Sequence, residues 1–306
     1  MKLNKKLSLI LSVSIILILS FSVITIAETD LTIFHTNVHG RVKVDAEIMG
    51  MPYLASVVND YRSRGDVLLL DAGDFLHGRP LVSKLEGESA IELMNYLGYE
   101  AMAPGNHDFN YGYQKTLELN EMMDGSIIAT NVTKDGELLF DPYLIKEVDG
   151  KKIGIFGLAT SDTYTSTHPD NVKGLEFLDM IESSREYVDI LQNQEEVDFV
   201  IGLTHVGINN STEIAESVEG IDLIIDGHSH TLLKEGKRVG STLIVMANEY
   251  TKYLGKVEVD FQNGEINLKA SLLSAADVKE NYEPDPEVET MLGEYEDQLV
   301  EIMLGN

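Results

Sequence analysis

The chain has 306 residues and is strongly acidic, because 51 Asp and Glu against 23 Lys and Arg give a formal net charge of −28 at pH 7. Such a surface repels nucleic-acid polymers and anionic membranes, so a nucleic-acid polymer is excluded as a partner. The absence of Cys excludes disulfide bonds, a lipidated cysteine and thiolate-bound zinc or iron–sulfur centres.

The N-terminal segment has the pattern of an export signal. Lys2, Lys5 and Lys6 precede a charge-free run of 21 residues, 7–27, which ends in the small residue Ala27. This pattern predicts a secretory signal over 1–27 and a secreted or bacterial cell-envelope location, either extracellular or periplasmic. The run is also long enough to span a bilayer, so an uncleaved membrane anchor remains the alternative.

After the signal, five apolar runs of strand length predict buried parallel strands, at residues 31–34, 67–70, 101–104, 199–203 and 221–225. Asp149-Gly150 predicts a type I′ turn between two further strands. The other predicted elements, in chain order, are helices at 51–62 and 89–97, the strands 143–148 and 152–158 of that hairpin, a helix at 178–192, strands at 243–247 and 256–261, and a turn at 262–264 leading into a strand at 266–272.

Each of the five apolar runs is followed by residues that bind hard divalent metals. In an open α/β sheet the functional crevice lies beyond the carboxyl ends of the strands. We therefore expect all five segments to deliver their side chains to one edge of one sheet, where they can assemble a two-metal centre. The segments are Asn37-Val38-His39, Gly73-Asp74, Gly105-Asn106-His107-Asp108, Thr204-His205 and Gly227-His228-Ser229-His230.

The types of candidate ligand narrow the choice of metal ion. Imidazole nitrogens combined with carboxylate and amide oxygens suit Mn, Fe, Zn, Co or Mg. Asp74 is the natural bridging carboxylate of the set, and the nearby Gly73 and Gly78 allow backbone and ligand to approach closely. His228 and His230 are two residues apart, and we expect the backbone to leave regular strand geometry where both turn toward one cleft.

These motifs resemble those of the calcineurin-like metallophosphoesterases and, within them, the 5′-nucleotidase family. The resemblance spans about residues 30–260 and implies a four-layer α/β/β/α sandwich of the metallo-dependent phosphatase type. It also implies two divalent metal ions a few ångströms apart, bridged by an Asp and a hydroxide. By position, one ion would take Asn37, His39, Asp74 and His230, and the other would take Asp74, Asn106, His205 and His228.

The chain departs from the family pattern in two places. The first motif is one residue shorter than usual, and Asn37 stands two residues before His39 where the family has a carboxylate. A neutral amide beside a divalent cation should weaken that metal site. Many relatives also carry an Asp three residues after the His of Gly-Asn-His, where this chain has Asn110. The partner that orients His107 is therefore open between Asp108 and Asn110.

The resemblance implies direct hydrolysis, in which the metal-bridging hydroxide attacks a nucleotide or related small phosphate ester. His107 would stabilise charge on the phosphoryl oxygens and protonate the leaving group as a general acid. Two alternatives remain: a 2′,3′-cyclic phosphodiesterase or nucleotide-sugar hydrolase, and a degenerate, non-catalytic binding module.

The predicted domain division is a signal over 1–27, a metallophosphoesterase domain over 28–275 and an acidic, linker-like helix over 276–306. Related nucleotidases continue through such a helix into a second domain that holds the nucleoside. We expect either a separate polypeptide to supply that domain or the catalytic domain to hold the substrate alone. A truncated gene would give the same sequence.

Overall fold

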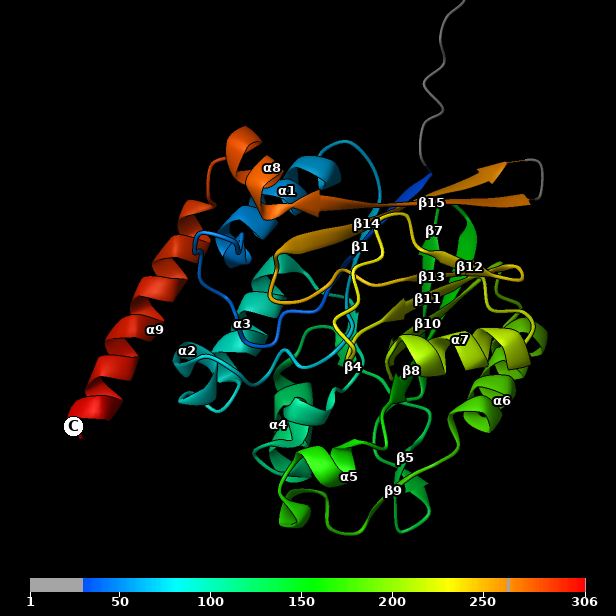
Figure 1. Ribbon diagram of the computed structural model, residues 1–306, viewed down its shortest axis with the longest axis horizontal. Helices are drawn as coiled ribbons and strands as arrows, with labels where there is room; N and C mark the ends of the chain where they lie inside the picture. The colour runs from blue at the N-terminus through cyan, green and yellow to red at the C-terminus, as the bar shows by residue number, and fades with distance from the viewer. Residues whose placement is uncertain (1–29, 263–264, 306) are drawn as a thin grey trace, which may run out of the picture.

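The computed structural model describes residues 30–262 and 265–305, and its centre is a pair of six-stranded sheets packed face to face (Figure 1). In the first sheet the order is β15-β14-β1-β2-β3-β4. Strands β1 to β4 are parallel, whereas β14 and β15 run antiparallel and form the edge. The strands are β1 (Leu31–Thr36), β2 (Val67–Asp71), β3 (Ala101–Met102), β4 (Ser126–Ile127), β14 (Tyr253–Gln262) and β15 (Glu265–Ser274).

The second sheet has the order β12-β13-β11-β10-β8-β7, with four parallel central strands and an antiparallel strand at each edge. A separate three-stranded sheet has the order β6-β5-β9. The strands are β7 (Tyr143–Val148), β8 (Lys151–Ala159), β10 (Phe199–His205), β11 (Leu223–Asp226), β12 (Lys237–Val239) and β13 (Thr242–Val245), with β5 (Val132–Lys134), β6 (Glu137–Leu138) and β9 (Leu175–Phe177) in the small sheet.

Helices cover both outer faces of the sheet pair (Figure 1). Helices α1 (Gly50–Arg62) and α3 (Glu88–Leu97) bury their apolar sides on the first sheet, and α6 (Met180–Asn193) and α7 (Ile208–Ser217) on the second. Helix α9 (Pro286–Leu304) packs outside the first helical layer, against α1, α2 (Pro80–Ser83) and α3. The remaining helices are α4 (Tyr113–Met122), α5 (Thr163–Ser166) and α8 (Ala275–Asn281), with 3₁₀ turns at η1 (Asn106–Phe109) and η2 (Pro169–Val172).

The central core lies between the two sheets. Strand residues such as Ile33 and Leu70 from the first sheet meet Ile201 and Ile225 from the second, and all four are fully buried. Each parallel strand is therefore apolar on both faces, because one face meets the other sheet and the opposite face meets helices. This explains why the sequence shows continuous apolar runs rather than alternation.

The predicted four-layer α/β/β/α fold is confirmed, but the expectation of a single sheet edge was wrong. Strands β1, β2 and β3 belong to the first sheet, whereas β10 and β11 belong to the second. A strand that is buried on both faces carries no signal for which of two sheets it joins, so the sequence pattern could not separate them. The site is instead built where the carboxyl ends of strands from both sheets face one another.

Most of the predicted elements are present with small shifts at their ends. Asp149 and Gly150 have φ angles of 52° and 75°, as a type I′ hairpin turn requires. The predicted signal at 1–27 and the centre of the predicted 262–264 turn lie outside the described residues. Helices α2, α4, α5 and α7 and the small sheet were not predicted, and the helix predicted over 276–306 is divided into α8 and α9.

Helix α9 packs against the first helical layer. Its N-cap Asp285 accepts from the backbone amides of Glu287 and Val288 at 3.0 and 3.1 Å. Tyr295 is buried and donates to Glu92 Oε2 at 2.7 Å. Within 30–262 and 265–305, every helix is too short or too polar to cross a membrane.

Candidate metal centre

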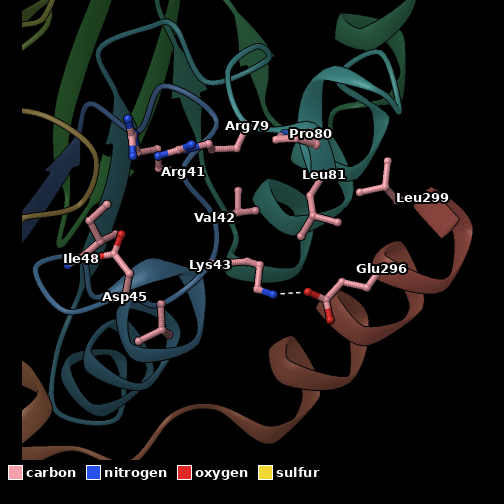
Figure 2. Close-up of a pocket in the computed structure, with 11 residues that line it drawn as sticks. Arg41, Val42, Lys43, Asp45, Ile48, Arg79, Pro80, Leu81, Glu296 and Leu299 are labelled. Atoms are coloured by element: carbon pink, nitrogen blue, oxygen red, sulfur yellow. Dashed lines mark hydrogen bonds and ion pairs between the residues drawn. The ribbon is translucent and has the colours of Figure 1, made fainter. Parts of the chain in front are cut away.

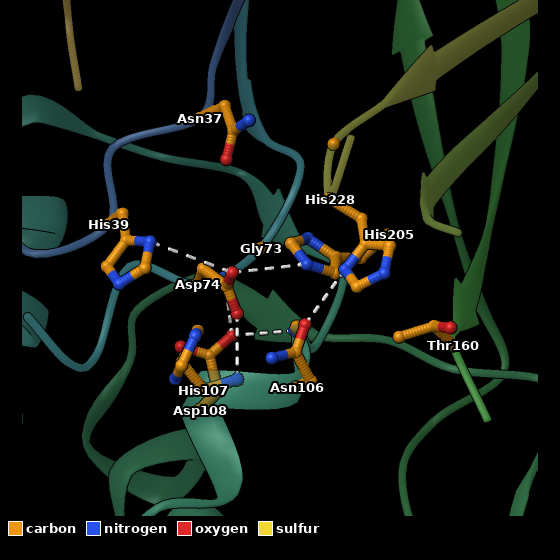
Figure 3. Close-up of polar contacts among 12 residues, drawn as sticks. Asn37, His39, Gly73, Asp74, Asn106, His107, Asp108, Thr160, His205 and His228 are labelled. Carbon is orange, nitrogen blue, oxygen red and sulfur yellow. Dashed lines mark hydrogen bonds and ion pairs between the residues drawn. The ribbon is translucent and has the colours of Figure 1, made fainter. Parts of the chain in front are cut away.

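Asp74 lies where the loops from both sheets meet (Figure 3). Its Oδ2 atom is 3.2 Å from His205 Nε2, on β10, and 3.9 Å from His39 Nδ1, in the loop after β1. Its Oδ1 atom accepts the backbone N–H of His107 at 2.8 Å. The carboxylate thus lies close to three separate segments of the chain and is only 2 % exposed, the position expected of a ligand shared between two cations.

Four of the predicted ligands have strained backbones. His39, Asp74, His228 and His230 have φ angles of 49°, 67°, 67° and 51°. Non-glycine residues rarely adopt this left-handed region, and such strain gathers at functional sites. The sequence-based expectation that the backbone leaves strand geometry near His228 and His230 is confirmed.

One group of predicted ligands, which we call the His205 half, consists of Asn106, His205 and His228. His205 is fully buried, and its Nδ1 lies 2.5 Å from the backbone oxygen of Ala72. That contact makes Nδ1 the donor and aims Nε2 at Asp74. His228 Nδ1 lies 2.9 Å from Asn106 Oδ1, so these side chains are held in place by the protein itself.

The other group, the His39 half, consists of Asn37, His39 and His230. Asn37 donates through Nδ2 to the backbone oxygen of Asn248 at 2.9 Å, which leaves Oδ1 facing inward. His230 Nδ1 lies 2.9 Å from Glu249 Oε2. Among the described residues, neither Asn37 Oδ1 nor His39 Nδ1 has a hydrogen-bond partner, although both atoms are buried.

His107 contacts Asn110 and not Asp108. Asn110 Nδ2 lies 3.0 Å from His107 Nδ1. The Asp108 carboxylate is fully buried and instead accepts three backbone amides, those of Asp74, Leu76 and Gly105, at 2.8, 2.8 and 2.7 Å. It ties the loop after β2 to the loop after β3, so its contacts are those of a positioning residue.

Asp226 performs the same task on the second sheet. It is fully buried at the end of β11, and its Oδ1 accepts the backbone amides of Val206, Gly207 and Gly227 at 3.0, 3.2 and 2.8 Å. The loops that carry His205 and His228 are thereby fixed to one another. Sequence reasoning missed this role, since Asp226 reads simply as the last residue of a strand.

Three more residues at the site were not predicted. Asp162 Oδ2 lies 3.1 Å from His228 Nε2, and Glu249 contacts His230 as described. His77 is the third, because one ligand atom each from His39, His77 and His107 lie within 4.8 Å of one another. The His77 and His107 rings stack with centroids 5.7 Å apart and planes 12° apart. Only His77 had a sequence signal, its place three residues after Asp74.

Burial and neighbouring charges shift the pKa values of three groups at the site. Burial alone would raise the pKa of Asp74, but His205 and the other imidazoles hold it well below its ordinary value. Burial alone would lower the pKa of His205, yet the Asp74 carboxylate raises it to about 9. Burial lowers the pKa of His39 to about 4, so this imidazole is neutral and ready to ligate at neutral pH.

The donor set fits divalent cations. His205 Nε2 is buried beside Asp74 but has no hydrogen-bond partner among residues 30–262 and 265–305. With Asn37 Oδ1 and His39 Nδ1, three predicted ligand atoms are buried without a hydrogen bond around one carboxylate, and of these only His205 Nε2 lies within close ion-pair distance of it. Unpaired buried polar atoms are costly, and a bound cation would satisfy all three.

Known proteins resemble this chain in sequence and in fold. The family model described as calcineurin-like phosphoesterase matches residues 38–232. The chain is 32% identical to the trifunctional nucleotide phosphoesterase protein YfkN of Bacillus subtilis (strain 168), over 89% of this chain and 21% of that protein. It is 29% identical to a 5′-nucleotidase of Vibrio cholerae serotype O1, over 85% of this chain and 54% of the relative.

A crystal structure of the calcineurin-like phosphoesterase YfkN from Bacillus subtilis superposes with a TM-score of 0.77 at 25% identity, covering 89% of this chain and 98% of that one. The chain spans about half, or less, of the length of the two curated relatives.

Proposed function

This chain belongs to the calcineurin-like phosphoesterase family, and we propose that it hydrolyses phosphate esters of nucleotides or related small molecules with two divalent cations. The observation that carries the proposal is the ring of buried, unpartnered ligand atoms around Asp74: Asn37 Oδ1, His39 Nδ1 and His205 Nε2.

In this proposal Asp74 is shared, the His205 half holds one cation and the His39 half holds the other. Cations bound there would lower the pKa of a water molecule, which makes it a nucleophile, and would stabilise negative charge on the phosphoryl oxygens. The mixed nitrogen and oxygen donors suit Mn, Zn, Fe, Co or Mg. Asn37 contributes no charge to the His39 half, and His77 faces the same space. We therefore propose that His77 compensates in part for the missing carboxylate.

His107 is the proposed catalytic side chain. An amide nitrogen can only donate, so Asn110 Nδ2 keeps His107 Nδ1 unprotonated and places the proton of a neutral imidazole on Nε2. That N–H can donate to a phosphoryl oxygen as negative charge develops on it. Asn110 positions His107, and Asp108 positions the backbone of both loops.

We also propose a secreted or cell-envelope location, which the charge-free run at 7–27 supports. The partner is a small-molecule phosphate ester. The strongly acidic surface repels anionic polymers, and a cationic metal centre would provide the local attraction that a phosphate needs.

The test is turnover by the purified protein after chelation and after addition of Mn²⁺, Zn²⁺, Co²⁺ or Mg²⁺. p-Nitrophenyl phosphate, a nucleoside 5′-monophosphate and bis-p-nitrophenyl phosphate distinguish monoesterase from diesterase activity. We expect metal-dependent release of phosphate from the monoesters. Hydrolysis of the diester alone would favour the phosphodiesterase alternative. Tight metal binding without any turnover would favour a non-catalytic binding module.

A further inference from the structure

The tripeptide His-Gly-Arg occurs twice at the site. His39-Gly40-Arg41 lies in the loop after β1, and His77-Gly78-Arg79 lies in the loop after β2. In each copy the histidine belongs to the imidazole cluster with His107, and the arginine follows two residues later.

The two copies touch backbone to backbone through their glycines. A Cβ atom on Gly40 would lie 2.5 Å from the carbonyl oxygen of His77, and one on Gly78 would lie 2.3 Å from that of His39. Their φ angles of 58° and 146° also disfavour other residues. The loops can therefore approach this closely only with glycine at both positions, and the contact aligns the two tripeptides.

Arg41 and Arg79, the arginines of the two tripeptides, line a cavity of about 390 Å³ (Figure 2). The cavity is next to the loops that carry His39 and His77. Val42, Ile48, Leu81 and Leu299 form its apolar wall. A volume of this order suits a small organic ligand.

Some of the charged side chains that line this cavity have hydrogen-bond or ion-pair partners in the protein, and others do not. Lys43 is paired with Glu296 across the cavity, and Asp45 Oδ1 accepts the backbone amides of Glu47 and Ile48 at 2.9 and 3.0 Å. Arg41 and Arg79 differ, because neither guanidinium makes a hydrogen bond or an ion pair with any residue that the structure describes. Arg41 only lies over the Tyr250 ring, 3.9 Å from its centroid.

Arg41 is partly exposed and Arg79 is exposed, so both guanidinium groups are open to a ligand in a chain of net charge −28. Each offers a planar fork of N–H donors that matches the oxygens of a phosphoryl group. Stacking on Tyr250 restrains the Arg41 side chain without using its hydrogen-bond donors, so its guanidinium N–H groups remain available to bind an anion.

We propose that Arg41 and Arg79 form a subsite for a second phosphoryl group of the substrate, with the apolar wall receiving the attached organic part. The inference rests on the proposed hydrolysis and narrows its substrate class to esters with a second phosphoryl group, such as nucleoside diphosphates. The histidines of the two tripeptides face the reacting phosphate, and the arginines hold the neighbouring one.

The test compares Arg41→Gln, Arg79→Gln and the double variant with the parent protein. Arg64→Gln is the matched control, since Arg64 is a surface arginine paired with Asp60, outside the cavity. Loss of charged hydrogen bonds should lower kcat/KM for ADP relative to p-nitrophenyl phosphate by about 10- to 100-fold in the double variant, mainly through KM. The control should leave the ratio unchanged. An equal loss with both substrates, or no loss, would overturn the subsite.

Binding of a methylene-bridged ADP analogue separates this inference from the proposed function. Calorimetry with the Mn²⁺-loaded protein should show weaker binding by the double variant, by about tenfold or more. If the parent hydrolyses no ester but binds the analogue in an Arg-dependent way, the proposed hydrolysis fails and the subsite stands. If the parent hydrolyses esters but the double variant binds the analogue as tightly as the parent, the subsite fails and the hydrolysis stands.

Discussion

The His205 half and the His39 half of the site meet at Asp74 but are built in different ways. His205 is the last residue of a buried central strand, and protein contacts fix its imidazole, the amide of Asn106 and the imidazole of His228. In the His39 half, His39 lies in a loop, and the ligand atoms of Asn37 and His39, like His205 Nε2, are buried without hydrogen-bond partners in the part of the chain that the structure describes. The half that a strand and protein contacts hold in place should bind its cation first, whereas the half that a loop carries depends more on the cation for its own order.

The halves also differ in their distance from the shared carboxylate and in the charge of their ligands. His205 Nε2 lies 3.2 Å from Asp74 Oδ2, whereas His39 Nδ1 lies 3.9 Å from the same atom. The His39 half has an amide where the family pattern has an anion, and it has the additional imidazole of His77 nearby. In the proposed metal centre, one half keeps the ligands of the family pattern, and in the other half neutral donors replace a carboxylate.

Asp74→Asn tests the residue that the halves share, and we expect the largest effect there. Loss of the shared anion should remove tight binding of both cations and lower turnover by at least about a thousandfold. Metal analysis after desalting and phosphate-release kinetics measure the two effects. Retention of two cations would show that Asp74 is not the common ligand. Asp60→Asn, on an exposed carboxylate, serves as the control.

His107→Ala separates chemistry from metal binding. We expect both cations to remain and turnover to fall by about two to four orders of magnitude, the usual range for a positioned acid–base group. Metal content and kcat are measured on the same sample. If the variant loses a cation, His107 is a ligand and the catalytic assignment is wrong.

Proton release on metal binding should distinguish the halves. The pKa of His205 is raised to about 9, so at neutral pH a cation must displace its proton. Affinity at this half should then rise about tenfold for each pH unit up to that value. Burial lowers the pKa of His39 to about 4, so binding there should vary little with pH above about 5.

Calorimetry in buffers of different ionisation enthalpy measures the protons released by each equivalent of metal. We expect about one proton from the tighter equivalent and close to none from the weaker one. The reverse order would mean that the His39 half fills first.

Asn37→Asp should strengthen the weaker half. Restoring an anion beside the cation is expected to tighten the second equivalent by about tenfold, ~1.4 kcal/mol. The gain is limited because the side chain loses its donor to the backbone oxygen of Asn248. Metal titration of the variant provides the measurement, and unchanged affinity would show that the amide is an adequate ligand.

His77→Ala should have the smallest effect. If His77 compensates for the neutral Asn37, its loss weakens the second equivalent by severalfold and leaves the first unchanged. In the Asn37→Asp background the effect should shrink, because the restored carboxylate makes the extra imidazole less necessary. Equal effects in both backgrounds would argue against compensation.

The sequence located most strands of the two large sheets, the turn at Asp149-Gly150 and the five segments that carry the predicted ligands, because each depends on local pattern. It did not assign β10 and β11 to a second sheet, since strands buried on both faces look alike. It left the partner of His107 open between Asp108 and Asn110, because the choice depends on the direction in which each of these side chains points. Asp162, Glu249 and Asp226 had no local signal at all, as their contacts come from residues distant in sequence.

The most direct test of the proposed two-cation site is titration of metal-free protein with Mn²⁺, with bound metal and phosphate release followed in the same samples. We expect two cations to bind per chain, the first tightly and with little turnover, and activity to rise with the second. Full activity with one cation, or activity without any cation, would contradict the two-half site built around Asp74.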